Sequence, residues 1–414
     1  MSAIKQAVFL CGGRGERLRP ITDHLPKPMV EVNEKPFLWR LMQQFSEQGI
    51  SRFILLTGYR SEQICSYFGD GSEWGWNITY SNGREEWKTG RRLWEARELL
   101  DESFFLMYSD NFAQVNLQKL NETFSETSAS VVLYVARKSR GNVAFRPDGR
   151  SIVYDPSRSR AELDHVEIGY MAVDRDAVIE ILRNNHDENF SALLLQLSAT
   201  ENILGIPAPC GYVSVADPAR LEVARSYMQA RKVLLLDRDG TLNIRQLTRR
   251  YVATWEEFEW ISESHRSLQQ LAEKGFSFVI ISNQAGVATG DVQPDELDRI
   301  HRNMVADLRM VGATVLSLHV CTDHWASHGL RRKPNPGMFY EAAIQHNIRL
   351  DRVMYIGDDQ RDVIAARNAG CMSILLGDQI SNQNGANVKP DYQAMTMLEA
   401  VPLVLRQYES WELE

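Results

Sequence analysis

A 414-residue chain is longer than one hydrophobic core usually serves, so two domains are expected. Hydrophobic residues make up 44% and charged residues 24%, which is typical of an ordered globular protein, and no segment approaches the roughly 18 apolar residues of a membrane span. The net charge of −8 argues against a nucleic-acid partner, because proteins that bind the phosphate backbone usually carry a basic excess.

The cysteines and the N-terminal segment predict where the protein works. Five cysteines are scattered along the chain without a paired framework, which suits a reducing cytosol. The apolar run 7–11 is too short for a signal-peptide core and leads directly into a glycine-rich turn, so it is interpreted as a first strand. A cytoplasmic protein with no membrane partner is therefore expected, and the possibility of a homo-oligomer stays open.

Short apolar strands alternate with helix-like segments, the pattern that builds parallel α/β sheets. Strands are expected at 7–11, 53–57, 104–108 and 131–135 in the first half, and at 233–236, 278–281, 316–320, 353–356 and 373–376 in the second. Apolar residues at helical spacing predict a helix over 218–231. A strand followed by a phosphate-binding loop starts twice, at Ala7 and at Lys232, so the predicted domains are 1–230 and 231–414.

A glycine loop follows the first predicted strand, and the segment Pro26-Lys27-Pro28-Met29 comes shortly after it. Gly12, Gly13 and Gly15 let the backbone approach a ligand and point N–H groups at phosphate oxygens, while Arg17 and Lys27 can neutralise the charge of a polyphosphate. The loop is neither a Walker A motif nor a dinucleotide fingerprint. With Leu18 and Pro20 included, it resembles the signature of the sugar-1-phosphate nucleotidyltransferases.

That resemblance covers roughly residues 1–230 and implies a Rossmann-like, GT-A-like domain with a mixed sheet. It also implies that Asp110, at the end of a strand, holds Mg²⁺ against the α-phosphate of a nucleoside triphosphate. In the family, a late Asp-Ile-Gly-Thr-Pro segment supplies a second metal carboxylate, but here Ser214 stands at the acidic position. Asp217 is the candidate replacement, and a plain helix N-cap is the alternative.

The acceptor region departs from the family. The Glu-Lys-Pro segment, whose lysine meets the sugar phosphate, becomes Tyr154-Asp155-Pro156, so a positive charge is missing there. Either Arg158 or Arg160 compensates, or the acceptor is not an ordinary hexose 1-phosphate. Glu167 and Gly169 fall where the family's Asn-Ala-Gly-Ile-Tyr approaches the sugar, which makes them candidate substrate-binding residues.

The base of the nucleotide is left open by the sequence. Gly90 and Arg92 lie in Lys88-Thr89-Gly90-Arg91-Arg92-Leu93, where the family lines its base pocket. The segment aligns with the Thr-Gly-Gly-Ala of heptose-1-phosphate guanylyltransferases, and Arg92 fits the Thr-Gly-Gly-Arg of glucose-1-phosphate cytidylyltransferases better. GTP and CTP both remain candidates, and a solvated helix start is the structural alternative.

The second half opens with two carboxylates at the end of a predicted strand, in Leu236-Asp237-Arg238-Asp239-Gly240-Thr241. In a strand-to-loop bend, this spacing lets Asp237 attack phosphorus while Asp239 protonates the leaving alkoxide and later activates water. The run resembles the first motif of the haloacid dehalogenase (HAD) phosphatases. The later motifs follow in order, as Ser282-Asn283-Gln284, Arg332-Lys333-Pro334 and Gly357-Asp358-Asp359 with Asp362 downstream.

The HAD resemblance implies a role for each of these residues. Ser282 and Lys333 would hold the transferring phosphoryl group, with Lys333 also keeping Asp237 ionised. Asn283 and Arg332 would contact the substrate. Mg²⁺ would be bound by Asp237, Asp239 and Asp358. Short spacings between the motifs predict a capless HAD domain with a Rossmann-like parallel sheet.

Within this class, the motifs resemble the histidinol-phosphate and heptose-1,7-bisphosphate phosphatases, many of which carry a zinc loop. Here Gly329 and Arg331 stand where a cysteine pair would be. The remaining candidates, at improvised spacing, are Cys321, Asp323, His324 and His328. Tetrahedral zinc needs four well-placed ligands, so zinc is not expected and Mg²⁺ is the expected cofactor of both domains.

The fusion of two activities suggests consecutive steps of one pathway. The phosphatase would remove the C7 phosphate of a heptose 1,7-bisphosphate, and the nucleotidyltransferase would join the heptose 1-phosphate to a nucleotide and release pyrophosphate. One alternative is a CDP-linked product made from another phosphorylated sugar or polyol. The other is a non-catalytic N-terminal domain on an active phosphatase, because Ser214 and Tyr154-Asp155-Pro156 depart from the family pattern.

Overall fold

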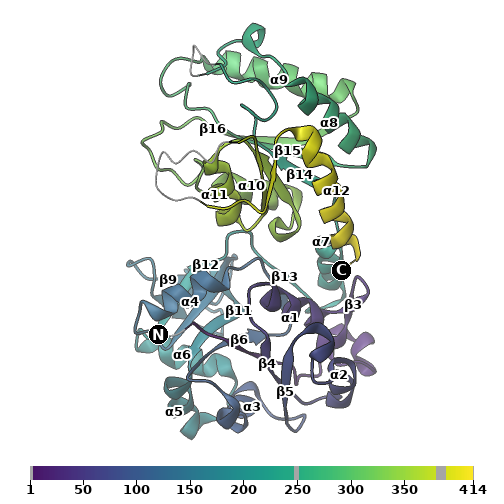
Figure 1. Ribbon diagram of the computed structural model, residues 1–414. Helices are drawn as coiled ribbons and strands as arrows, with labels where there is room; N and C mark the ends of the chain where they lie inside the picture. The colour runs from purple at the N-terminus through teal and green to yellow at the C-terminus, as the bar shows by residue number, and fades with distance from the viewer. Residues whose placement is uncertain (1–2, 247–250, 379–387, 414) are drawn as a thin grey trace. The chain divides into compact units, whose positions relative to one another are not determined.

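The computed structural model describes residues 3–246, 251–378 and 388–413. The chain divides into two compact units, Met1–Gln229 and Ala230–Glu414. Each unit is an α/β fold built around one large sheet (Figure 1). The expected fold class, a mixed sheet followed by a parallel one, is confirmed.

The first unit contains a nine-stranded sheet whose main path runs β10-β9-β11-β6-β1-β4-β5, with β8 joining β11 to β12. The strands of this sheet are β1 Gln6–Leu10, β4 Arg52–Thr57, β5 Asn77–Asn82, β6 Ser103–Tyr108, β8 Val131–Arg137, β9 Val143–Phe145, β10 Ile152–Tyr154, β11 His165–Asp174 and β12 Ile203–Pro207. Four neighbouring strands, β6, β1, β4 and β5, are parallel. The long strand β11 runs antiparallel to β6 and β8, which makes the sheet mixed.

Helices and short strands complete the first unit. The helices are α1 Phe37–Glu47, α2 Ser61–Phe68, α3 Thr89–Glu95, α4 Leu117–Ser125, α5 Arg175–Asn185, α6 Phe190–Ala199 and α7 Pro218–Met228. Two short two-stranded ladders pair β2 Glu31–Val32 with β3 Lys35–Pro36, and β7 Asn111–Phe112 with β13 Val213–Ser214. The second ladder matters for the site, because it brings the chain after β6 beside the segment that leads into α7.

Buried side chains fill both faces of the first sheet. Along β1, Val8 and Phe9 point to opposite faces because successive strand side chains alternate, and each belongs to a different hydrophobic cluster. Phe45 of α1 packs edge-on against Phe9 with ring centroids 5.3 Å apart, and stacks on Tyr170 of β11. The expected strands were recognisable because their buried residues form continuous apolar runs. The polar strand β5 gave no such signal.

The second unit contains a six-stranded, fully parallel sheet in the order β16-β15-β14-β17-β18-β19. Its strands are β14 Val233–Leu236, β15 Ser277–Asn283, β16 Thr314–Cys321, β17 Met354–Gly357, β18 Met372–Leu376 and β19 Tyr392–Ala394. Its helices are α8 Ser262–Glu273, α9 Pro294–Met310, α10 Gly337–His346, α11 Gln360–Ala369 and α12 Met397–Leu413. Chain order reverses direction beside β14, which is where open α/β sheets bind ligands.

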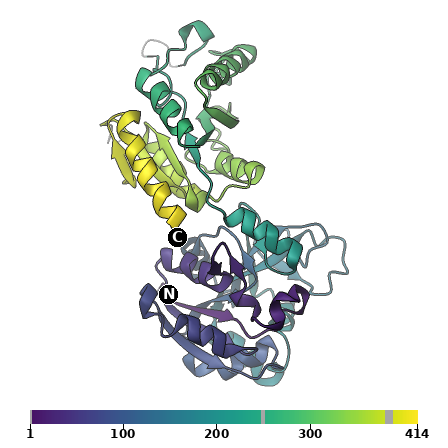
Figure 2. The same cartoon turned by 90° about the vertical axis from the view of Figure 1, so that its right-hand side faces the viewer.

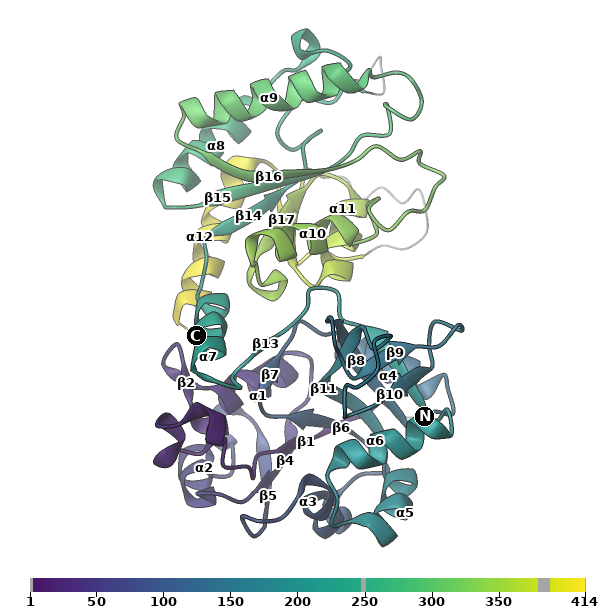
Figure 3. The ribbon, with the colours of Figure 1, turned by 180° about the vertical axis from the view of Figure 1, so that it is seen from behind.

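Helices cover both faces of this second sheet. Figure 3 shows α8 and α9 on one side and α10 and α11 on the other. The C-terminal helix α12, drawn in yellow in Figure 2, packs against α8 and β19. In the described ranges, the connections between consecutive strands hold no further sheet or inserted domain, and the pocket at the carboxyl ends of the strands is lined by the end of β15, the start of α11 and loops.

Candidate active sites

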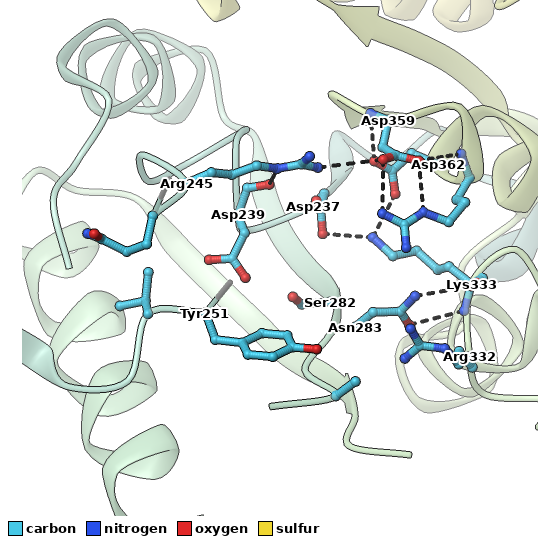
Figure 4. A pocket seen from close by; sticks show the side chains of 14 residues that line it. Asp237, Asp239, Arg245, Tyr251, Ser282, Asn283, Arg332, Lys333, Asp359 and Asp362 are labelled. Carbon is cyan, nitrogen blue, oxygen red and sulfur yellow. Dashed lines mark hydrogen bonds and ion pairs between the residues drawn. The ribbon is translucent and has the colours of Figure 1, made fainter. Parts of the chain in front are cut away.

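Two carboxylates follow β14, the central strand of the second unit. The Asp237 N–H donates a hydrogen bond to the Ile356 carbonyl of β17 (2.9 Å), which extends the sheet by one residue. The chain then turns through Gly240, whose φ of 87° favours glycine. A Cβ there would come within 2.0 Å of an Asp358 carboxylate oxygen. This turn places Asp237 and Asp239 in one pocket (Figure 4).

Lys333 joins Asp237 to a second buried acid. Its Nζ donates to Asp237 Oδ1, to Asp362 Oδ1 and to the Tyr355 hydroxyl, each at 2.7 Å, and the residue is only 4% exposed. Burial raises the pKa of Asp237 to about 6, and the ammonium group of Lys333 opposes that rise. Burial alone would lower the pKa of Lys333, but the carboxylates raise it. At neutral pH, Asp237 is therefore largely ionised and available as a nucleophile.

Asp239 is held by three donors. Arg238 Nη2 contacts both of its carboxylate oxygens at 2.8 Å, Asn243 donates at 2.9 Å and Gln284 at 2.7 Å. Burial would raise the pKa of Asp239, but these donors, with Arg238 the strongest, hold it below its usual value. Arg238 is itself fully buried, and its Nη1 lies 3.1 Å from His301 Nε2 on α9.

The described residues contain one group of at least three metal-ligating side chains, Asp237, Asp358 and Asp362, with one oxygen from each within 4.8 Å of the others. Burial, followed by the charge of Asp237, raises the pKa of Asp358 to about 8. A divalent cation fits this group, because it would neutralise the repulsion between the acids. The Asp239 carboxylate is not part of the group, since its donors turn it elsewhere. The assignment of Asp239 to the metal site therefore stays a prediction.

Arg245 lies directly beside this group. Its Nε donates to the backbone carbonyl of Asp239 (3.1 Å), and its Nη2 pairs with Asp358 Oδ1 (2.8 Å). The guanidinium therefore already bridges two oxygens that face the acidic group. Arg245 was not predicted as a site residue, because no motif marks a cation two residues beyond Asn243.

The pocket around Asp237 is polar and carries several cations. Lys333, Arg245, Arg332 and Arg361 all line it, together with acids and Tyr251 (Figure 4). Their ammonium and guanidinium groups offer hydrogen-bond donors to an anionic ligand, beside four aspartates that line the same pocket.

Two motif residues of this pocket are fixed by hydrogen bonds. Ser282 is almost fully buried, and its hydroxyl accepts a hydrogen bond from Gln284 (2.8 Å). The Asn283 side chain exchanges two hydrogen bonds of 3.1 Å with the backbone of Lys333. Asn283 therefore positions the lysine loop, in addition to lining the pocket.

In the first unit, the glycine loop follows β1 as expected. Gly15 adopts a φ of 68° before the short 3-10 helix Glu16–Leu18, which carries the exposed Arg17. A Cβ on Gly15 would lie 2.6 Å from the Lys27 side chain, so the loop and the Lys27 segment touch. Lys27 Nζ in turn pairs with Asp110 Oδ2 at 2.8 Å. The structure thus brings the loop, Lys27 and Asp110 together.

Arg92 and Gly90 have different surroundings from those expected of a base pocket. The Arg92 side chain is buried, and its guanidinium donates to the backbone carbonyls of Thr57 (2.6 Å) and Gly12 (3.2 Å). Gly90 packs against the backbone of Glu188, where a Cβ would come within 2.4 Å of the carbonyl oxygen. This corrects the expectation that Arg92 and Gly90 line a base pocket. The Arg92 guanidinium stabilises the glycine loop through hydrogen bonds to backbone carbonyls, and Gly90 permits a close backbone contact.

Asp217 takes the helix N-cap role that was the alternative to a metal ligand. Its Oδ1 accepts the backbone N–H of Arg220 (3.0 Å) as the N-cap of α7, and its Oδ2 faces the Arg220 side chain at 3.4 Å. Both oxygens are therefore engaged by α7. Ser214 pairs with Asn111 in the ladder next to Asp110, so the position of the missing carboxylate does lie beside Asp110.

Glu167 lies on β11 close to Asp110. Its Oε2 atom is buried and has no hydrogen-bond partner among the described residues. Burial, followed by the charge of Asp110, raises the pKa of Glu167 to about 7. Gly169 next to it has a φ of 86°, and a Cβ there would lie 2.9 Å from Tyr108. Glycine at this position thus lets β11 approach the end of β6.

Comparison with known proteins agrees with this geometry. Residues 6–145 match the family described as nucleotidyl transferase, and residues 330–400 match the family described as HAD-hydrolase-like. A D-glycero-β-D-manno-heptose-1,7-bisphosphate 7-phosphatase of Rhodopseudomonas palustris is 33% identical over 147 residues, which are 34% of this chain and 80% of that protein. The chain joins a nucleotidyl transferase domain to a HAD phosphatase domain.

Two further relatives match the nucleotidyl transferase domain. The "Probable glucose-1-phosphate cytidylyltransferase" of Bacillus subtilis is 28% identical over 254 residues, 55% of this chain and 98% of that protein. The D-glycero-α-D-manno-heptose 1-phosphate guanylyltransferase of Aneurinibacillus thermoaerophilus is 36% identical over 129 residues, 31% of this chain and 56% of that protein. The chain therefore spans about half the length of the guanylyltransferase it matches. In the described residues, no helix has the length and apolar character of a membrane span.

The loop that carries zinc in many related phosphatases has other features here. Cys321 is buried at the end of β16, whereas Asp323, His324 and His328 are exposed. The His324 Nδ1 accepts a hydrogen bond from the Ala326 N–H, so the loop is organised by its own polar contacts. The described residues bring no three of these candidates into a group with metal-ligand spacing.

Proposed function

We propose that this protein makes a nucleotide-activated heptose in two steps, with residues 231–414 as the phosphatase and residues 1–230 as the nucleotidyltransferase. The phosphatase removes the C7 phosphate of a heptose 1,7-bisphosphate. The transferase then joins the heptose 1-phosphate to a nucleotide and releases pyrophosphate. Names of relatives of both domains support the heptose, since they are a heptose-bisphosphate phosphatase and a heptose-phosphate guanylyltransferase. The proposed setting is the cytoplasm.

The observation that carries the phosphatase reaction is the Asp237–Lys333–Asp362 cluster inside a cation-lined pocket. Asp237 attacks phosphorus, and the departing sugar oxygen takes a proton from Asp239. Water then attacks the aspartyl phosphate and returns its proton to Asp239, releasing phosphate. The pKa of Asp239 is lowered in the free protein, so its carboxylate starts ionised. When the phosphoryl dianion binds, its negative charge raises the pKa of Asp239, and the carboxylate takes up the proton that it later donates.

The cations of the pocket support a substrate with two phosphates. Lys333 and the buried Ser282 face the phosphoryl group that is transferred. Arg332 is free to meet a second anion, because the hydrogen bond that ties its guanidinium goes to a neutral carbonyl of Asp323 (3.2 Å). By contrast, Arg361 is engaged by the Asp359 carboxylate through two contacts of 2.9 Å. A second phosphate would give the Arg332 guanidinium an anionic hydrogen-bond acceptor that a monophosphate does not supply.

The transferase reaction is supported by the glycine loop, Lys27 and Asp110. A phosphate oxygen of the sugar attacks the α-phosphorus of the nucleoside triphosphate, and pyrophosphate leaves. Lys27 and Arg17 neutralise charge on the polyphosphate, while N–H groups of the loop approach its oxygens. Mg²⁺ is the proposed cofactor of both domains, held by Asp110 in one and by Asp237 with Asp358 in the other. When bound, it neutralises charge on the phosphoryl group being transferred.

GTP and CTP are both proposed as nucleotide donors. A specific observation favours CTP and another phosphorylated sugar or polyol as a second candidate function: the cytidylyltransferase relative is matched over 98% of its length. The match of Arg92 to the cytidylyltransferase motif does not favour CTP, because its guanidinium donates to backbone carbonyls.

The test is a matrix of the four nucleoside triphosphates against sugar and polyol phosphates, including bisphosphates, with products identified by mass spectrometry. We expect phosphate release from heptose 1,7-bisphosphate, and then pyrophosphate release with GTP or CTP. A CDP-polyol would establish the second candidate. Phosphate release without turnover of any nucleoside triphosphate would overturn the transferase and leave a non-catalytic N-terminal domain.

A further inference from the structure

The nucleotidyltransferase lacks the second metal carboxylate at its usual position. Mg²⁺ at a nucleotide site is commonly held by one or two carboxylates together with phosphate oxygens. Asp110 supplies one carboxylate, but Ser214 occupies the position from which the second would come. Asp217, the replacement suggested by the sequence, caps the first turn of α7 through Oδ1, and its Oδ2 faces the Arg220 side chain at 3.4 Å. Another acid must therefore be considered.

The strand register brings Glu167 to Asp110. β11 and β6 are antiparallel, with Tyr170 opposite Met107. Asp110 lies two residues beyond the end of β6, and Glu167 lies three residues before Tyr170, close enough to Asp110 for the two charges to interact. A hydrogen bond from the Asn111 side-chain amide to the Ile168 carbonyl (3.3 Å) ties the two segments together at this point.

The Glu167 side chain has a property that a structural carboxylate rarely has. Its Oε2 atom is buried and lacks a hydrogen-bond partner among the described residues, although burying an unpaired carboxylate oxygen is costly. The ammonium of Lys27 is bonded to Asp110, and the charge of Arg158 lowers the pKa of Glu167, but neither cation donates a hydrogen bond to the buried Oε2 atom. A divalent cation between Asp110 and Glu167 would satisfy the unpaired oxygen and the repulsion between the acids together.

We propose that Glu167 is the second carboxylate ligand of the nucleotidyltransferase metal site, replacing the acid that is lost at Ser214. This inference rests on the proposed nucleotidyltransferase function and deepens it. Glu167 is then a cation ligand in this chain, whereas the resembling family has an asparagine that approaches the sugar at this position. The second carboxylate is thus supplied by β11 and not by the segment before α7.

Mn²⁺ binding to the full-length protein, measured by electron paramagnetic resonance, tests this inference without any turnover. Asp358→Asn first removes a ligand of the phosphatase site, and this variant is expected to retain one Mn²⁺ per chain. Adding Glu167→Gln should weaken the retained site at least tenfold. The matched control Glu162→Gln changes an exposed glutamate five residues away and should leave Mn²⁺ affinity unchanged.

A rescue variant guards against a merely structural effect of Glu167→Gln. Ser214→Asp, added to Glu167→Gln in the Asp358→Asn background, restores two carboxylates beside Asp110 and should recover most of the Mn²⁺ affinity. The inference is overturned if Glu167→Gln leaves Mn²⁺ affinity unchanged, if Asp358→Asn binds no Mn²⁺, or if Ser214→Asp gives no recovery. A loss caused instead by Asp217→Asn would also overturn it.

The two proposals for this domain can fail separately. Normal Mn²⁺ binding that depends on Glu167, without turnover of any nucleoside triphosphate, would sink the proposed transferase reaction alone. Turnover that persists while Mn²⁺ binding ignores Glu167 would sink only the ligand assignment.

Discussion

Replacing Arg92 with lysine should destabilise the nucleotidyltransferase domain. The Arg92 guanidinium is buried and donates to four backbone carbonyls, those of Thr57 (2.6 Å), Gly12 (3.2 Å), Arg84 (2.9 Å) and Glu85 (3.1 Å). Lysine keeps the charge but presents a compact ammonium at the end of a flexible stem, so it cannot reproduce this planar arrangement of donors. We expect at least two of the four hydrogen bonds to be lost.

The size of the effect follows from these contacts. A hydrogen bond to a charged group contributes about 1.5–3 kcal/mol, so two lost bonds cost at least about 3 kcal/mol. For a domain of this length, each kcal/mol shifts the melting temperature by about 2–4 °C. The melting temperature of the nucleotidyltransferase domain should therefore fall by about 6–12 °C.

Calorimetric unfolding of the full chain provides the assay, with phosphate release at 25 °C as an internal check on the other domain. Arg91→Lys is the matched control, because Arg91 is partly exposed and pairs with Glu95 at 2.6 Å. The control should change stability by no more than about 0.5 kcal/mol. If Arg92→Lys leaves unfolding unchanged but selectively weakens binding of GTP or CTP, Arg92 reads the base and the buried-anchor interpretation is wrong.

Three further predictions concern the phosphatase. Asp237→Asn should reduce phosphate release by about 10³-fold or more, since it removes the nucleophile, and a retained rate would refute that assignment. Arg245→Ala should lower the Mg²⁺ concentration needed for half-maximal phosphate release, because the guanidinium no longer competes for Asp358 and the Asp239 carbonyl; a higher requirement would contradict this. In metal-free protein, the free energy of unfolding of the phosphatase domain should fall as pH rises from about 4 to about 8. Native Asp358 has a pKa of about 8, so over this range it keeps a proton that the unfolded state has already lost. Denaturant unfolding of the wild type and Asp358→Asn checks the last point, and equal pH slopes for the two would contradict it.

The sequence alone identified the two reaction classes, because phosphate chemistry depends on residues held close together along the chain. The glycine loop with Lys27, and Asp237 with Asp239, each combine a strand end and a turn, so their spacing is visible without a structure. Buried strands were recognisable for a related reason, since a strand covered on both faces is a continuous apolar run. Polar strands such as β5 lack that mark.

Only the tertiary structure decided which side chains face the reacting centre and which support it. Arg92 and Asp217 fit nucleotide and metal roles by position in the sequence, yet packing commits one to backbone carbonyls and the other to a helix N-terminus. Conversely, Glu167 interacts electrostatically with Asp110, and Arg245 pairs with Asp358, across large separations along the chain. A local pattern specifies residues that are neighbours along the chain, whereas burial and electrostatic pairing depend on which distant segments the fold brings into contact.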